Sequence, residues 1–255
     1  MTSVQGADVA RWRAVEHALA LADGSSTTVG RHWAADVTAW LVSPRQDLTA
    51  SADSVSGPGD TVQALGRLAP CTLRVLAAVH GERDWWAEIT RGVERREETC
   101  VVGLRHDPGG AVSRLVWLRA PLVPPLDAGE PDAAPDGRPI MERYFEDLMR
   151  SEFRSAAAHF TADTIYSHPP YGAGSERVLF RGRDALWRGF VSQRGPSPAR
   201  QVITGFWQQH ARVFVEGVVE GIPNGGAFVS TAQLTTGGEI ARYVAFYSAQ
   251  RLAEA

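Results

Sequence analysis

The chain has 255 residues, a net charge of −3, 44% hydrophobic and 22% charged residues, which is ordinary for a soluble protein of one large or two small domains. This charge offers no overall positive field for nucleic acid or an anionic membrane, and no apolar run is long enough to span a bilayer. All 26 basic residues are arginine, so enzymes that use a lysine Schiff base, including pyridoxal phosphate enzymes, are excluded.

Two cysteines, Cys71 and Cys100, cannot form a disulfide framework, and charged residues interrupt the apolar residues near the N-terminus. These features are typical of a cytoplasmic protein without a signal peptide, so we expect a cytoplasmic location.

Along the first half, apolar residues recur with helical spacing over Asp8–Ala22, which predicts a short amphipathic helix. A strand is expected after the motif HWAADV at 32–37, a loop over Ser51–Asp60 and a second helix over Asp60–Leu68. Four β-rich runs complete this half.

The segment Ala120–Pro139 holds six of the fifteen prolines, and this density predicts an exposed linker over residues 120–138. The linker would separate a first domain, residues 1–119, from a second domain, residues 139–255.

The second half repeats the order of the first. Helices are predicted over Pro139–Arg150 and Arg183–Gln193, with a strand after the motif HFTADT at 159–164. The remaining strands are predicted over Gln201–Gln208, Arg212–Gly221, Ala227–Thr235 and Glu239–Ala249. Helices followed by an antiparallel meander indicate an α+β fold.

Three matches at a nearly constant offset indicate that the halves are homologous. The two HxxAD motifs are 127 residues apart, and the offset is 128 both for the GG-containing motifs at 109–114 and 237–242 and for Glu88 and Glu216.

Several motifs of the second half resemble a known family. They are Phe160, Asp163 and Tyr166 in one strand, the GRDAL sequence at 182–186, and the GEIAR sequence at 238–242. In this combination the sequence resembles the SnoaL-like branch of the nuclear transport factor 2-like superfamily, as a tandem repeat. The resemblance implies two cone-shaped α+β domains, each a curved, mostly antiparallel sheet wrapped around short N-terminal helices and enclosing one pocket. Members include polyketide cyclases, ketosteroid isomerases, epoxide hydrolases, dehydratases and non-catalytic binding proteins, so fold alone does not settle function.

The candidate catalytic pair is Tyr166 and His168. Residues two apart on a strand share a face, and the resemblance implies that this strand borders the pocket. A histidine can move protons in either direction, and a phenol can donate a hydrogen bond to a developing oxyanion. The alternative is that His168 is a hydrogen-bonded structural residue and the tyrosines are packing. In the first half, Ala39 and Leu41 take the corresponding places.

Glu216 is the third catalytic candidate, because it interrupts an apolar run. A carboxylate there either has a raised pKa in a pocket or forms a structural ion pair with Arg242 or Arg212, and we favour the ion pair because Glu88 repeats it. The aspartate base that the resemblance implies is not visible after Asp184, so proton transfer would fall to His168 or Glu216.

The pocket is expected to be aromatic and to suit a flat apolar or polyketide-like ligand, although any single ring is more often ordinary core. The expected substrate-binding residues are Tyr171, Trp187, Phe190, Phe206, Tyr243 and Tyr247. No HxxxH or CxxC pair predicts a metal site, and no cofactor is expected.

The function that these residues favour is cofactor-free acid–base catalysis (isomerisation, cyclisation, dehydration or hydrolysis) on an apolar, oxygenated small molecule of secondary metabolism. The alternative is a non-catalytic small-molecule-binding or assembly protein that uses the same pocket. The first domain would be a degenerate copy, and because superfamily members commonly dimerise through the outer faces of their sheets, we expect the two linked domains to form an intramolecular pseudo-dimer.

Overall fold

The computed structural model describes residues 4–27, 32–42, 53–68, 71–93, 96–121, 123, 133–171, 176–222 and 225–248. These residues fall into two compact units, one up to residue 123 and one from residue 133. Within the described ranges, no helix is long and apolar enough to cross a membrane.

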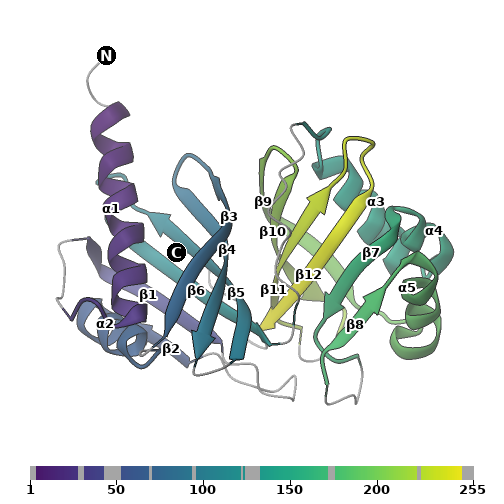
Figure 1. Ribbon diagram of the computed structural model, residues 1–255, viewed down its shortest axis with the longest axis horizontal. Coiled ribbons are helices and arrows are strands. Elements are labelled where there is room, and N and C mark those ends of the chain that lie inside the picture. The colour runs from purple at the N-terminus through teal and green to yellow at the C-terminus, as the bar shows by residue number, and fades with distance from the viewer. Residues whose placement is uncertain are drawn as a thin grey trace. The chain divides into compact units, whose positions relative to one another are not determined.

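The first unit consists of two helices and one six-stranded sheet (Figure 1). Its elements are α1 (Val4–Asp23), β1 (Trp33–Val42), β2 (Asp53–Ser56), α2 (Pro58–Gly66), β3 (Thr72–His80), β4 (Asp84–Val93), β5 (Arg96–His106) and β6 (Val112–Pro121). The strand order is β2-β1-β6-β5-β4-β3, and only the β1–β6 pair is parallel.

The second unit repeats this sheet. Its elements are α3 (Arg138–Met149), α4 (Phe153–Ala158), β7 (Phe160–His168), β8 (Val178–Arg181), α5 (Arg183–Gly189), a π-helix η1 (Phe190–Arg194), β9 (Arg200–Gln209), β10 (Arg212–Glu220), β11 (Ala227–Leu234) and β12 (Ile240–Ser248). The strand order β8-β7-β12-β11-β10-β9 matches that of the first unit, again with one parallel pair, β7–β12.

The strand registers confirm the internal repeat. Ala39 pairs with Leu115 in the first unit, and Tyr166 pairs with Tyr243 at the corresponding place in the second. Glu88 and Glu216 likewise occupy equivalent positions, since their partners Val101 and Val229 are also 128 residues apart. Both units are therefore α+β folds with the same mostly antiparallel sheet, as expected.

Helices cover one face of each sheet, and the hydrophobic core lies between them (Figure 1). In the second unit, Tyr144, Phe145 and Leu148 of α3 pack onto inward-facing residues of the strands, such as Val215 and Phe228. A helix face with this spacing buries its apolar side chains only against another apolar surface, which is why α3 lies along the sheet.

The structure differs from the sequence prediction in four short elements. The segment Ser51–Asp60, predicted as a loop, contains β2 and the start of α2, and β8, α4 and the π-helix η1 were not predicted. Strands of four residues, such as β2 and β8, carry too little periodicity to stand out, and they form because β1 and β7 supply a pairing edge.

The predicted linker lies largely outside the described residues. Strand β6 continues through Pro121 and α3 begins at Arg138, while residues 122 and 124–132 between them are not described.

Candidate functional site

All five tyrosines of the chain lie in the second unit, around His168. They come from three places: Tyr144 from α3, Tyr166 and Tyr171 from β7 and the segment that follows it, and Tyr243 and Tyr247 from β12. Parallel pairing of β7 with β12 places Tyr166 beside Tyr243, so the repeat's one parallel pair builds the centre of the cluster.

Tyr166 stands in a row of stacked rings. Its ring centroid lies 5.1 Å from that of Tyr243, with 14° between the planes, and 6.0 Å from that of Phe180 on the other side. Phe190 meets Tyr166 edge-on at 5.4 Å. Such contacts fix the orientation of the phenol, which is 1% exposed.

Three hydroxyl groups form a hydrogen-bonded chain through this row. The Tyr144 hydroxyl donates to the Tyr166 hydroxyl at 3.3 Å, and the hydroxyls of Tyr166 and Tyr171 are 2.8 Å apart. Burial raises the pKa of all three phenols well above the usual value, so they remain neutral hydrogen-bond donors. The chain leads from buried Tyr144 to partly exposed Tyr171.

His168 closes the cluster at its exposed end. Its imidazole stacks on the Tyr171 ring at 4.4 Å and lies 5.7 Å from that of Tyr247. The Nδ1 atom is 2.7 Å from the carbonyl oxygen of Pro169. A carbonyl oxygen only accepts, so Nδ1 carries the proton, and in the neutral ring Nε2 keeps its lone pair.

Burial among these rings lowers the pKa of His168 to about 3, with the charges of Arg177 and Arg194 adding to the effect and the hydrogen bond to Pro169 opposing it. The imidazole is therefore neutral at physiological pH. The predicted pair shares one face of β7 with its ring planes 5° apart, and Tyr166 makes its hydrogen bonds to other tyrosines.

The structure brings together six of the nine predicted site residues, namely Tyr166, His168, Tyr171, Phe190, Tyr243 and Tyr247. Trp187 and Phe206 pack at the edge of the core instead, where Arg154 lies 4.9 Å from the Trp187 ring and Arg138 lies 5.0 Å from the Phe206 ring.

Glu216 is not part of this cluster. Val213, Val215 and Val219 of β10 face the helices, and the alternation of a strand directs Glu216 to the opposite face of the sheet. The partners predicted for it, Arg212 and Arg242, have even numbers on β10 and β12 and lie on that face as well.

Sequence reasoning missed Tyr144 and Arg194. Tyr144 was read as part of the apolar face of the helix Pro139–Arg150, because helical spacing does not show where a hydroxyl ends. Arg194 is the last residue of the π-helix, one residue past the end of the predicted helix.

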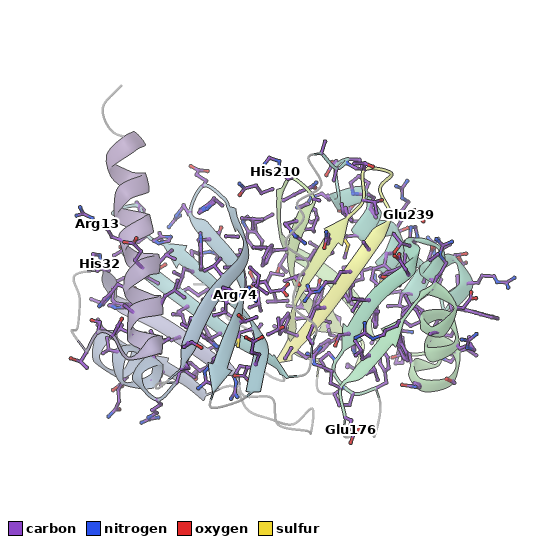
Figure 2. All side chains as sticks on the ribbon, viewed as in Figure 1. Arg13, His32, Arg74, Glu176, His210 and Glu239 are labelled. Carbon is purple, nitrogen blue, oxygen red and sulfur yellow. The ribbon has the colours of Figure 1, made fainter. Side chains whose placement is uncertain are left out.

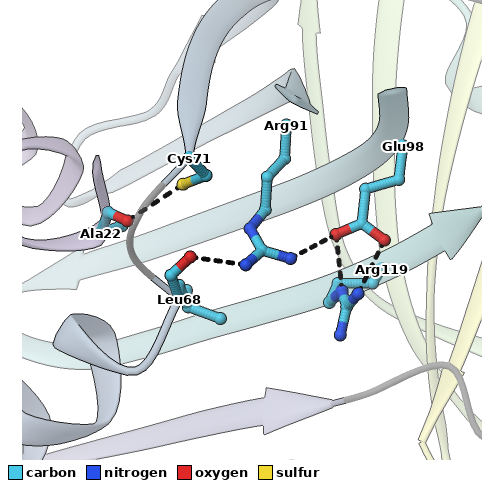
Figure 3. Close-up of polar contacts among 6 residues, drawn as sticks. All are labelled: Ala22, Leu68, Cys71, Arg91, Glu98 and Arg119. Atoms are coloured by element: carbon cyan, nitrogen blue, oxygen red, sulfur yellow. Dashed lines mark hydrogen bonds and ion pairs between the residues drawn. The ribbon is translucent and has the colours of Figure 1, made fainter. Parts of the chain in front are cut away.

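The first unit carries a different cluster at the corresponding end of its sheet (Figure 3). Arg119 pairs with Cys100 as Tyr247 pairs with Phe228, so an arginine stands where the second unit has a tyrosine. Glu98 accepts two hydrogen bonds from Arg119, at 2.7 and 2.8 Å, and one from Arg91 at 2.8 Å. This end of the first unit is closed by its own ion pairs.

A cavity of about 250 Å³ opens elsewhere in the second unit, at the start of α5. Its lining residues are Ala162, Arg181, Gly182, Arg183, Asp184, Ala185 and Arg188, and none of them is a predicted site residue. Arg183 is held by the Phe160 carbonyl at 2.7 Å and by Glu239 at 2.8 Å, whose position Figure 2 shows. In the described part of the chain, no group of three histidine, cysteine or acidic side chains is placed to hold a metal ion.

Comparisons with known proteins identify the fold only. No protein-family model matches the sequence, and no curated protein matches it. Among solved structures, an NTF2-like protein of unknown function from Burkholderia pseudomallei is 18% identical, with 45% of this chain and 92% of that chain covered and a TM-score of 0.38. An NTF-2 like protein from Burkholderia xenovorans is 17% identical, with 47% and 86% covered and a TM-score of 0.35.

A third similar structure is that of the epoxide hydrolase/cyclase-like enzyme SalBIII, which acts in pyran ring formation in the polyether salinomycin. It is 19% identical, with 44% of this chain and 90% of that chain covered and a TM-score of 0.36. Structures of the superfamily that the sequence resembles are thus among the solved structures similar to this chain, each covering a little less than half of it.

Proposed function

We propose that the second unit is a cofactor-free acid–base enzyme that acts on an apolar, oxygenated small molecule of secondary metabolism. The observation that carries the proposal is the hydrogen bond of His168 Nδ1 to the Pro169 carbonyl, 2.7 Å long. It fixes the tautomer in which Nε2 is an unprotonated base.

The tyrosine chain supplies the matching acid. With Tyr144 donating to Tyr166, the Tyr166 proton is directed to Tyr171, and the Tyr171 proton is left for a bound carbonyl oxygen. Neutral donors aimed at an oxygen that gains charge stabilise an enolate. In this scheme Nε2 of His168 removes a proton from the carbon beside the carbonyl, the electron pair moves to the oxygen, and the proton then returns to another atom.

The test uses a probe ketone, because proton abstraction is measurable without the natural substrate. For 2-tetralone in deuterated buffer, we expect the full chain to accelerate exchange of the protons beside the carbonyl, measured by NMR. His168→Ala should lower the enzymatic rate by about 10²–10⁴-fold, and Tyr171→Phe by about 10²-fold. His210→Asn is the matched control, because His210 is exposed at the β9–β10 turn with a φ of 51° that asparagine tolerates (Figure 2).

An unchanged exchange rate in His168→Ala would overturn the assignment of the base, and a rate no higher than that of the buffer would overturn the proposed activity. The melting temperature of each variant shows whether it is folded.

The second candidate function, non-catalytic binding of a small molecule at the same cluster, is favoured by the low pKa of His168. An imidazole with a pKa of about 3 is a weak base. A ligand that raises the melting temperature of the full chain, without any exchange activity, would support binding over catalysis.

Pairing of the two units stays a prediction from the sequence. On each sheet, the face opposite the helices carries apolar side chains, for example Val116 and Leu118 on β6 and Val244 and Phe246 on β12. Small-angle scattering that showed two separately moving lobes would contradict an intramolecular pseudo-dimer.

A cytoplasmic location is also proposed. Both Cys71 and Cys100 are free thiols in the structure, which fits a reducing compartment.

A further inference from the structure

Arg194 is held in place by the π-helix that follows α5. Phe190 begins this helix fully buried and contacts the Tyr166 ring, and Gly195, with a φ of 61°, ends it. The guanidinium lies 5.8 Å from the Phe153 ring, which itself packs on Phe190. π-Helical turns are rare and occur frequently at functional sites.

The hydrogen bonds of Arg194 use little of its capacity. Nη1 donates to the carbonyl of its neighbour Gly195 at 3.2 Å, and within the described residues no carboxylate pairs with it. A guanidinium has five N–H groups, so most of its donors are available to a ligand. Arg177, the second arginine near the cluster, differs because it donates to Ser167 Oγ at 3.0 Å and to the Ala245 carbonyl at 2.7 Å.

The charge of Arg194 reaches four members of the cluster. It lowers the pKa of Tyr144, Tyr171 and Tyr247, against the stronger effect of burial, and it lowers the pKa of His168. Since these groups are neutral at physiological pH, the cluster holds a positive charge without a negative charge from its own members.

We propose that Arg194 binds an anionic oxygen group of the ligand, so that the second unit takes an aromatic or polyketide-like acid rather than a neutral molecule. The inference rests on the proposed function for the position of the site and adds the class of ligand. The acid group would accept hydrogen bonds from the guanidinium, while the apolar part lies against the exposed rings of Tyr171 and Tyr247.

Calorimetric titration of the full chain with 2-naphthoate and with neutral 2-naphthylmethanol tests this assignment. We expect tighter binding of the acid, a loss of about 10–100-fold in its affinity in Arg194→Gln, and partial retention in Arg194→Lys. The affinity for the alcohol should stay the same in both variants. Arg143→Gln is the control, because Arg143 is an exposed arginine on α3 next to Tyr144.

Equal affinity of the wild-type chain for acid and alcohol would overturn the proposal, as would an unchanged acid affinity in folded Arg194→Gln, or no binding of the acid at all. The two proposals fail separately. Acid preference without proton exchange would leave Arg194 as the anion-binding residue and remove the enzymatic function, whereas exchange without acid preference would do the reverse.

Discussion

The imidazole of His168 lies flat against the ring of Tyr171, with 4.4 Å between the centroids and 17° between the planes. The same tyrosine shares a hydrogen bond with Tyr166, so base and donor are positioned by one residue. A substitution at Tyr171 therefore acts on both halves of the proposed chemistry, which is why the conservative change to phenylalanine, which keeps the ring, is the informative one.

The first prediction concerns acid stability. An unfolded histidine has a pKa of about 6.5, and in the folded chain the pKa of His168 is lowered to about 3. Between these values the unfolded chain binds a proton that the folded chain does not, so stability is lost as the pH falls from 6.5 toward 3. His168→Gln removes this contribution, which is at most about 1.4 kcal/mol for each pH unit.

Urea unfolding at pH 7 and pH 5 measures the difference. We expect the wild-type chain to lose more stability than His168→Gln over this range. Parallel losses in the two proteins would show that the imidazole is protonated in the folded state.

The second prediction separates Glu216 from the site. Glu216→Gln should leave exchange activity and ligand affinity unchanged, because the carboxylate lies on the face of β10 opposite the cluster. It should lower the free energy of unfolding by about 1–3 kcal/mol, the usual cost of disturbing a buried polar group. Glu88→Gln, at the equivalent position of the first unit, is the matched comparison. Lost activity at unchanged stability would make Glu216 the base.

The sequence predicted the regular elements well, since they depend on local periodicity. The helix expected over Pro139–Arg150 is α3, Arg138–Met149, and the strand period of two placed Tyr166 and His168 on one face. The face of Glu216 was not predictable in the same way. Strand β10 has apolar residues on both faces, such as Val213 and Phe214, so its alternation carries no signal.

The rest of the site depends on tertiary packing. The hydroxyl of Tyr144 meets that of Tyr166 only because α3 crosses the inner face of the sheet. Arg194 reaches the cluster only because a π-turn extends α5, and no helical pattern in the sequence distinguishes a π-turn from an α-turn.

The third prediction tests the packing behind Tyr166. A Cβ atom on Gly189 would overlap the ring of Phe180, which stacks on Tyr166. Gly189→Ala should therefore destabilise the second unit by about 1–3 kcal/mol. It should also lower affinity for 2-naphthoate, because Tyr166 must shift with Phe180. Gly66→Ala is the control, since open space surrounds that position in α2, and it should be neutral or slightly stabilising. Thermal unfolding of both variants decides the point.

The fourth prediction concerns the first unit. Glu98 is the shared partner of Arg91 and Arg119, and the Arg91 side chain is only 9% exposed (Figure 3). Glu98→Ala would leave buried positive charge without its partner, at a cost of about 3–5 kcal/mol in stability. If the first unit is a degenerate copy, exchange activity measured below the unfolding transition should be unchanged. A loss of activity in the folded variant would mean that the first unit takes part in function.

The confinement of every tyrosine to one cluster makes the protein unusually suited to spectroscopy. Biosynthetic incorporation of 3-fluorotyrosine would place all five fluorine labels in the second unit, around His168. Each fluorine resonance then reports on the site itself, without background from the first unit. A single titration could follow ligand entry at Tyr171 and Tyr247 separately from changes at buried Tyr144, and so show how far a bound molecule reaches along the hydroxyl chain.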